Sequence, residues 1–313
     1  MRFALLLAAL ATAFALAAGP VSASELVQDP NAQLLSLKAN AKGEALLTYR
    51  RANGQLRHVL VWGAINARAP SPDVAQVRFR WDYAGGWGKY RNGKYWKSFK
   101  DGCKPYDGPA LPLLAAACKA PDGSYWSVQA WQRRLPLLGF DPWLPQQSNV
   151  ELHLAHFSGE LPKLELYANW SYDGRWQSVF GRDTYLGQPV YGFGSTQKGV
   201  PRDGYGRNLY IDTYGSAYGP GWRREAGILT HRGTGTFCHG FVPQRPFPGY
   251  PSQDVRPAAT GERYRVTAGG PGVLPIVQTE VAGLTRADLR RDPEFDSVFD
   301  SVMAGDKVCA SER

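Results

Sequence analysis

Two alternating segments of apolar and polar residues, joined by a short connector within 150–172, constrain the fold more than any other stretch of the chain. Residues two apart in an extended chain point to the same side, so this period of two is typical of strands with one buried and one wetter face. The connector at 158–162 contains Gly159 and Pro162, as expected of a loop between paired strands. We therefore predict a hairpin within a β-sheet core.

The same alternation recurs elsewhere and extends the prediction to a whole β fold. Residues 44–62 form two alternating segments around Asn53 and Gly54, which both tolerate the positive φ of a tight hairpin turn. Further half-buried strands are predicted at 77–83 and 125–133. We predict a mainly β protein that is an antiparallel β-sandwich, with a jelly-roll order as one possible form.

Two short helices are expected beside the sheets. In 109–120, Pro109 stands near the first turn, and leucine, alanine and cysteine side chains recur on one side. Near 292–303, Asp292 and Pro293 make a typical helix start, and apolar residues follow at helical spacing. We predict that this second helix lies on the sheet.

The first 23 residues have the composition of a signal peptide. Arg2 precedes an apolar run rich in leucine and alanine, and residues 21–23 form a small-residue cleavage site. No later segment reaches the roughly 18 consecutive apolar residues that a membrane helix needs. We therefore expect a secreted or extracytoplasmic envelope protein without a transmembrane segment after cleavage.

The chain is basic, with a formal net charge of +9. Removing the predicted signal peptide removes one arginine and no acidic residue, so +9 becomes +8. A basic exported protein is attracted to anionic partners such as acidic polysaccharides or lipid headgroups. The alternative is that this modest excess only aids solubility, because no run of like charges stands out.

Four cysteines in an exported chain predict two disulfides. Of the three possible pairings we favour Cys103 with Cys118, which closes a short loop, and Cys238 with Cys309, which ties the C-terminal tail to the body. Metal binding by thiolates is the weaker alternative, because the sequence has no CxxC pair.

We expect residues 24–313 to form one compact β-rich domain. Roughly 290 residues suffice for one large β domain or two smaller ones. The best candidate boundary is 135–148, where three prolines prevent regular pairing. Because this stretch is too apolar for a free linker, we predict a packed crossover between two halves of one body.

The first candidate site is the segment 81–99, in which aromatic rings are interleaved with lysine and arginine. Flat rings stack on sugar faces, and cations attract uronate, sulfate or phosphate groups. The alternative is that the rings only fill an open end of the sandwich. Export argues against nucleic acid as the partner. The candidate ligand-binding residues are Trp87, Lys89, Tyr90, Arg91, Tyr95 and Trp96.

The second candidate site is the segment 203–239, where ionisable groups stand among glycine and tyrosine. Two such groups held close together, with separated pKa values, are what general acid–base catalysis requires. Imidazole and carboxylate ligands could also form a metal site, but the spacing is not diagnostic. The alternative is that these groups bond loop backbone. The candidate catalytic residues are Asp212, Glu225, His231 and His239.

Other catalytic patterns are missing from the sequence. There is no GxSxG nucleophile elbow and no GxxxxGK[ST] phosphate loop, so we predict no cofactor. His153 and His156 stand three apart on a strand and so point to opposite faces, which excludes a shared metal ion. We expect His156 to be buried and His153 to be a surface group.

The leading hypothesis is an exported, non-catalytic protein that binds envelope or extracellular glycan through the aromatic and cationic segment. One alternative is a secreted hydrolase of polysaccharide that uses the 203–239 groups. A second alternative is an envelope module that binds another protein. The sequence leaves the oligomeric state open.

Overall fold

The structure is a computed structural model that describes most of the chain from Leu26 onward. The predicted signal peptide lies outside the described residues. The described residues are 26–87, 93–132, 149–172, 176–190, 194–195, 201–216, 219–224, 228–231, 234–241, 261–270 and 273–283, with residues 297, 301 and 302. They form four antiparallel sheets and one short 3₁₀ turn, η1 (Tyr95–Lys97), so the prediction of a mainly β, antiparallel protein is confirmed.

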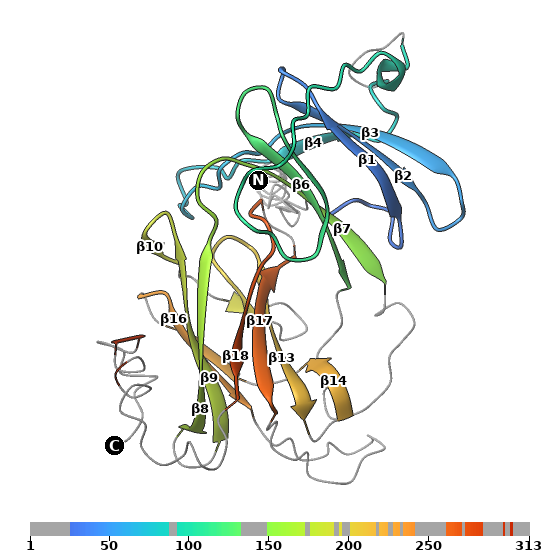
Figure 1. Cartoon of the computed structure of the whole chain (residues 1–313). Coiled ribbons are helices and arrows are strands. Elements are labelled where there is room, and N and C mark those ends of the chain that lie inside the picture. The colour runs from blue at the N-terminus through green and yellow to red at the C-terminus, as the bar shows by residue number, and fades with distance from the viewer. Residues whose placement is uncertain are drawn as a thin grey trace, which may run out of the picture.

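Two sheets near the N-terminus pack face to face and are here called the N-terminal sheet pair (Figure 1). Tyr49 and Val61 from one sheet share a buried apolar core with Trp126 and Leu154 from the other. Burial of such side chains stabilises the pair by about 25 cal/mol per Å². The first sheet contains β1 (Gln33–Ala39), β2 (Glu44–Arg50), β3 (Leu56–Gly63) and β4 (Phe79–Asp82), and the second contains β5 (Leu114–Lys119), β6 (Tyr125–Gln132) and β7 (Val150–Phe157).

The other two sheets form the C-terminal sheet pair, with Val179 and Phe237 facing Ile211 and Val266 across a second core (Figure 1). One sheet has the order β10 (Gln188–Pro189), β9 (Trp176–Tyr185), β16 (Thr236–Phe241) and β15 (Ile228–His231), with β8 (Lys163–Tyr172) also paired to β9. The other has the order β11 (Gly194–Ser195), β12 (Pro201–Arg202), β13 (Asn208–Ser216), β17 (Arg263–Gly269) and β18 (Val277–Ala282), with β14 (Gly219–Arg224) also paired to β13.

The predicted hairpin over 150–172 is wrong, although both of its strands exist. β7 pairs with β6 in the N-terminal sheet pair, and β8 pairs with β9 in the C-terminal sheet pair. The connector at 158–162 therefore carries the chain from one sheet pair to the other. The side chain of Asn66 fixes its start, because its Oδ1 accepts the backbone N–H of Ser158 at 2.9 Å. By contrast, the hairpin predicted around Asn53 and Gly54 is confirmed as β2 and β3.

The prediction of a helix at 109–120 is also wrong, because residues 114–119 form β5. This strand hydrogen-bonds to β6 on one side, and on the other the backbone of Lys119 exchanges two bonds of 2.9 and 3.0 Å with Lys104. The predicted disulfide between Cys103 and Cys118 is present and holds the two segments together. These tertiary contacts override the helix propensity of an alanine-rich segment.

Other predictions concern stretches that the structure describes only in part. Within 292–303, residues 297, 301 and 302 have helical backbone, and the remainder lies outside the described residues. Cys238 is disulfide-bonded, while Cys309 lies outside the described residues, so their pairing stays a prediction. The stretch 135–148 also lies outside them; it connects β6 and β7, which pair with each other in one sheet. Among the described residues, no helix is long and apolar enough to cross a membrane.

The two sheet pairs meet through the second face of β6. The side-chain amide of Gln129, which is 1% exposed, accepts a hydrogen bond from the backbone N–H of Ile276 at 2.9 Å and donates one to its carbonyl at 2.8 Å. The ring of Trp131 packs edge-on against Tyr210 of β13, with centroids 4.9 Å apart. We call this contact region the junction. It places the outer face of the β13 sheet against β6.

Candidate functional site

The first predicted site does not present its rings together. Trp87 is 57% exposed, whereas Tyr95 and Trp96 are half-buried. Lys89, Tyr90 and Arg91 lie outside the described residues.

The half-buried rings of this segment cover the outer face of β2 and β3. Trp96 stacks on His58 with ring centroids 3.9 Å apart, and the hydroxyl of Tyr95 donates to buried Glu44 at 3.1 Å. Phe99 is buried against Leu46 in the same cluster. Burial lowers the pKa of His58, as expected of a histidine at the edge of a core. Tyr95 and Trp96 thus have packing roles.

Replacing Trp96 with alanine should therefore destabilise the protein, whereas Trp87→Ala should not. Trp96→Ala removes a half-buried ring and its stack on His58, so we expect the free energy of unfolding to fall by about 2 kcal/mol. The exposed Trp87 stacks on no ring of the described residues, and its replacement should change stability by less than about 0.5 kcal/mol. Urea unfolding of both variants measures the difference; equal losses would contradict the assignment.

Both histidines of β7 are buried, so the prediction of a surface His153 is wrong. His153 is 5% exposed and His156 is 4% exposed. His156 stacks on Trp126 and bonds Ser124 and the carbonyl of Gly63, each at 2.8 Å, and burial lowers its pKa. His153 lies on the opposite face of β7, which Trp131 covers at the junction. The prediction that the two histidines point to opposite faces of β7 is confirmed, but other side chains cover both faces.

The structure does not bring Asp212 and His239 together. His239 is two residues from Phe237 on β16 and shares its side, which faces the core between the C-terminal sheets. Asp212 follows Ile211 on β13 and points away from that core. His231 pairs with Phe237 through its backbone, and Glu225 lies outside the described residues. No group of three histidine, cysteine, aspartate or glutamate side chains in the described ranges could hold a metal ion.

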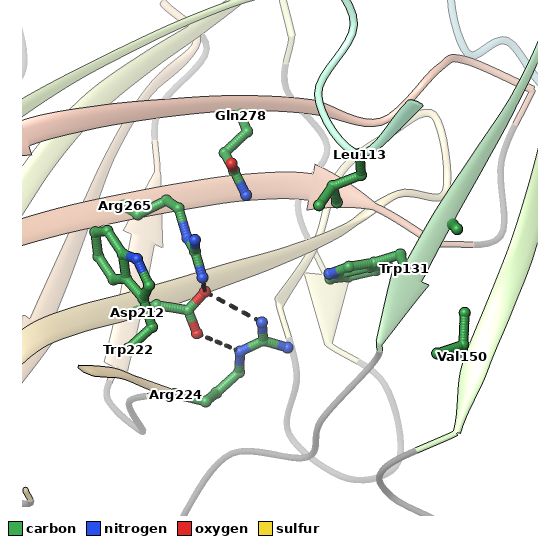
Figure 2. Close-up of a pocket in the computed structure, with 9 residues that line it drawn as sticks. Leu113, Trp131, Val150, Asp212, Trp222, Arg224, Arg265 and Gln278 are labelled. Atoms are coloured by element: carbon green, nitrogen blue, oxygen red, sulfur yellow. Dashed lines mark hydrogen bonds and ion pairs between the residues drawn. The ribbon is translucent and has the colours of Figure 1, made fainter. Parts of the chain in front are cut away.

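Asp212 instead lies in a cavity of about 540 Å³ at the junction (Figure 2). Strands of both sheet pairs contribute to its wall: β6 and β7 from one, and β13, β14, β17 and β18 from the other. Figure 2 shows Trp131 and Trp222 on different sides of the ion cluster. The lining residues are Leu113, Ala130, Trp131, Val150, Asp212, Trp222, Arg224, Arg265 and Gln278.

Strand register assembles the polar centre of this cavity. β13 lies between β14 and β17, and Asp212 stands directly opposite Arg224 on one side and Arg265 on the other. Arg224 donates from Nε to Oδ1 at 2.7 Å, and Arg265 donates from Nη2 to Oδ2 at 2.8 Å. Figure 2 shows the two guanidinium groups converging on the carboxylate. Neighbouring strands therefore hold three charges within hydrogen-bonding distance.

Aromatic rings flank each guanidinium group of the cluster. The Cζ atom of Arg224 lies 4.2 Å from the ring centre of Tyr210, and that of Arg265 lies 4.1 Å from the ring centre of Trp222. One row further along the sheet, Arg263 lies 4.4 Å over Tyr214. Cations and rings thus alternate across the face, and each ring stabilises the charge beside it.

The carboxylate of Asp212 is ionised in this setting. Burial alone would raise its pKa, but the adjacent guanidinium groups of Arg224 and Arg265 hold the pKa below its ordinary value. Among the described lining residues, the charged ones are two arginines and one aspartate, which together carry one net positive charge. The neighbouring ion pair of Arg263 and Glu280, whose charged atoms are 3.6 Å apart, adds no net charge. The cavity can therefore receive an anionic group.

A second ion cluster, between β9 and the turn at 203–207, is closed to solvent. Arg207 donates to Asp203 and to Asp183, each at 2.7 Å, and all three side chains are fully buried. Burial, more than the second carboxylate, raises the pKa of Asp183 to about 7. One guanidinium thus serves two acids in the core, which makes this cluster structural.

No protein-family model, no curated protein and no solved structure matches this chain.

Proposed function

We propose that this protein is an exported, non-catalytic glycan-binding protein and that the junction cavity is its binding site. The observation that carries the proposal is the combination of two indole rings, Trp131 and Trp222, with two guanidinium groups around one cavity. A volume of about 540 Å³ lies within the range of small-ligand sites, which extends from roughly 300 to 1,000 Å³. A short oligosaccharide is of suitable size.

The lining has the two kinds of surface that a sugar needs. The flat rings offer apolar faces for the C–H side of a pyranose, while the donors of Arg265 and Gln278 can bond ring hydroxyls. Trp222 is half-buried, so part of its ring faces the solvent side of the site. The proposal moves the binding site from the 81–99 segment to the junction, since Tyr95 and Trp96 are occupied in packing.

Binding without catalysis is the better match to this lining. Glycoside hydrolysis uses two carboxyl groups, one of which must be able to donate a proton. Among the described residues that line the cavity, Asp212 is the acidic one, and both of its oxygens accept bonds from arginine. A carboxylate held ionised in this way is a poor proton donor.

We further propose that the protein is exported and that it consists of two β-sandwiches. Export follows from the predicted signal peptide and is compatible with the disulfide between Cys103 and Cys118. We propose that the two sheet pairs are two β-sandwiches within one exported chain, with the ligand bound between them. The partner is a glycan of the envelope or the extracellular space.

A glycan array followed by calorimetry on the mature protein tests this function. We expect at least one glycan to bind and Trp222→Ala to weaken its binding about tenfold or more, because a stacked ring is lost. Trp87→Ala is the matched control, since it removes an exposed indole outside the cavity, and it should bind as the wild type does. Thermal unfolding confirms that each variant is folded.

Three outcomes would contradict the proposal. Failure of the mature protein to bind any glycan would exclude the function. Unchanged binding by Trp222→Ala would exclude the site. Loss of binding in Trp87→Ala alone would return the site to the 81–99 segment.

A further inference from the structure

We infer that the junction cavity selects a sugar that carries one carboxylate, of the hexuronate class, and that Arg265 binds this carboxylate. The inference rests on the proposed function and adds the chemical class of the ligand. It is carried by the charge of the lining, by the unused donors of Arg265 and by the position of Trp222.

The described lining residues carry more positive than negative charge. Asp212 is shared by Arg224 and Arg265, and the other six described lining residues are uncharged. A ligand carboxylate would bring a second negative charge to the guanidinium group of Arg265, whereas a neutral sugar would bring none. The charge therefore favours a monoanion.

Arg265 has the donors that a carboxylate needs. Its Nε and Nη2 both point to Oδ2 of Asp212, at 3.2 and 2.8 Å. Within the described part of the chain, its Nη1 donates to no protein atom. The end of a guanidinium, formed by Nη1 and Nη2, matches the two oxygens of a carboxylate. With its side chain 20% exposed, Arg265 is accessible from solvent.

The position of Trp222 favours a sugar over other carboxylates. Its ring lies against the guanidinium of Arg265, with the Cζ atom 4.1 Å from the ring centre. A pyranose that stacks beside this indole would have its C6 substituent close to the arginine. In a hexuronate that substituent is the carboxylate, so one ligand satisfies both groups at once.

The test compares galacturonate, which carries one carboxylate, with its methyl ester, which has the same ring and no charge. At low ionic strength we expect wild-type protein to bind the acid about 10- to 100-fold more tightly than the ester, because one charge-assisted contact is lost. Arg265→Gln should abolish this preference and retain weak binding of both ligands. Arg265→Lys should restore only part of it, since lysine keeps the charge but not the planar fork.

Arg263→Gln is the matched control. Arg263 belongs to the same strand and lies near the same indole, 5.3 Å from the ring centre of Trp222, but does not line the cavity. This variant should keep the preference for the acid. If Arg265→Gln does not fold, wild-type protein provides a second measurement: salt should weaken binding of the acid and leave binding of the ester nearly unchanged.

Each remaining outcome decides between alternatives. Equal affinity for acid and ester, or a preference that survives Arg265→Gln, overturns the inference. Equally tight binding of a sulfated sugar overturns the assignment to carboxylate, and tighter binding of a peptide with a free C-terminus overturns the assignment to sugar. Binding of neutral glycans alone overturns the inference while the proposed function stands, whereas binding of no glycan removes both.

Discussion

Replacing Asp212 with alanine is expected to lower the free energy of unfolding by about 3–5 kcal/mol. Asp212 is 2% exposed and accepts hydrogen bonds from two arginines. Its removal takes from Arg224, which is 6% exposed, a carboxylate bonded at 2.7 Å in a poorly solvated place. The fall in the free energy of unfolding should therefore exceed the net contribution of the ion pair to stability. Urea unfolding at neutral pH measures it.

Asp212→Asn separates charge from shape in the same experiment. Asparagine keeps the volume and one acceptor, so the loss should be smaller than for alanine but still above about 1 kcal/mol. Glu280→Ala is the control, because its pair with Arg263 is 41–47% exposed and such pairs contribute roughly 0–1 kcal/mol. A loss of less than about 1 kcal/mol for Asp212→Ala would mean that water enters and solvates both guanidinium groups.

Arg207→Met is expected to be equally damaging at neutral pH, with a loss of about 3–5 kcal/mol. Methionine fills much of the space of arginine but leaves Asp183 and Asp203 without their shared cation in a site where all three side chains are 0% exposed. Protonation of Asp183, whose pKa burial raises to about 7, would relieve the repulsion, so the variant should regain stability on acidification from pH 7 to pH 5. A loss that does not change over this range would contradict this account of uncompensated negative charge.

The wild-type cluster predicts a pH dependence of opposite sign to that of an ordinary salt bridge. The pKa of Asp183 is raised from 3.8 to about 7, so between these values the folded state holds a proton that the unfolded state has lost. Its contribution to the free energy of unfolding is greatest below about pH 3.8 and is lost as the pH rises to about 7. Asp183→Asn should remove this dependence.

The difference between wild type and Asp183→Asn is the quantity to measure. Burial lowers the pKa of His58 and of His156, and their contribution is lost as the pH falls below about 6.5, with the opposite sign. Subtraction cancels these histidines. Denaturant unfolding from pH 4 to pH 8 should show the advantage of wild type over the variant shrinking as the pH rises. A constant difference would show that Asp183 stays ionised throughout.

The sequence predicts most strands and few of their partners. Alternation is a local property, and it correctly places strands at 150–157 and 163–172. Pairing depends on residues far away: a five-residue connector with glycine and proline fits a hairpin and a passage between sheets equally well. The same limit explains the wrong prediction of a helix at 109–120. Leucine and alanine occur in helices and in strands, and here hydrogen bonds to Lys104 and to β6 decide for a strand.

The candidate site shows the same limit more clearly. Arg224, Asp212 and Arg265 are spread over 54 positions, and only the register of three strands places them side by side. A local pattern is visible beforehand, since Tyr210, Asp212 and Tyr214 alternate on one side of a strand. Such a pattern predicts a face with aromatic and charged groups, but not what covers it. Asp212 was therefore selected as an ionisable residue, while Arg265 and Trp222 were missed.

The short passage from β7 to β8 has a consequence for how the junction holds together. Residues 158–162, fully extended, span at most about 17 Å, so the two sheet pairs cannot diffuse apart once the chain is made. A tether of this length keeps the facing surfaces at an effective concentration in the millimolar range. A contact across the junction, such as the amide pair of Gln129 with Ile276, then acts within one molecule and needs less free energy than the association of two separate molecules would. An interface that is held by covalent connection in this way can remain polar and hydrated at its centre.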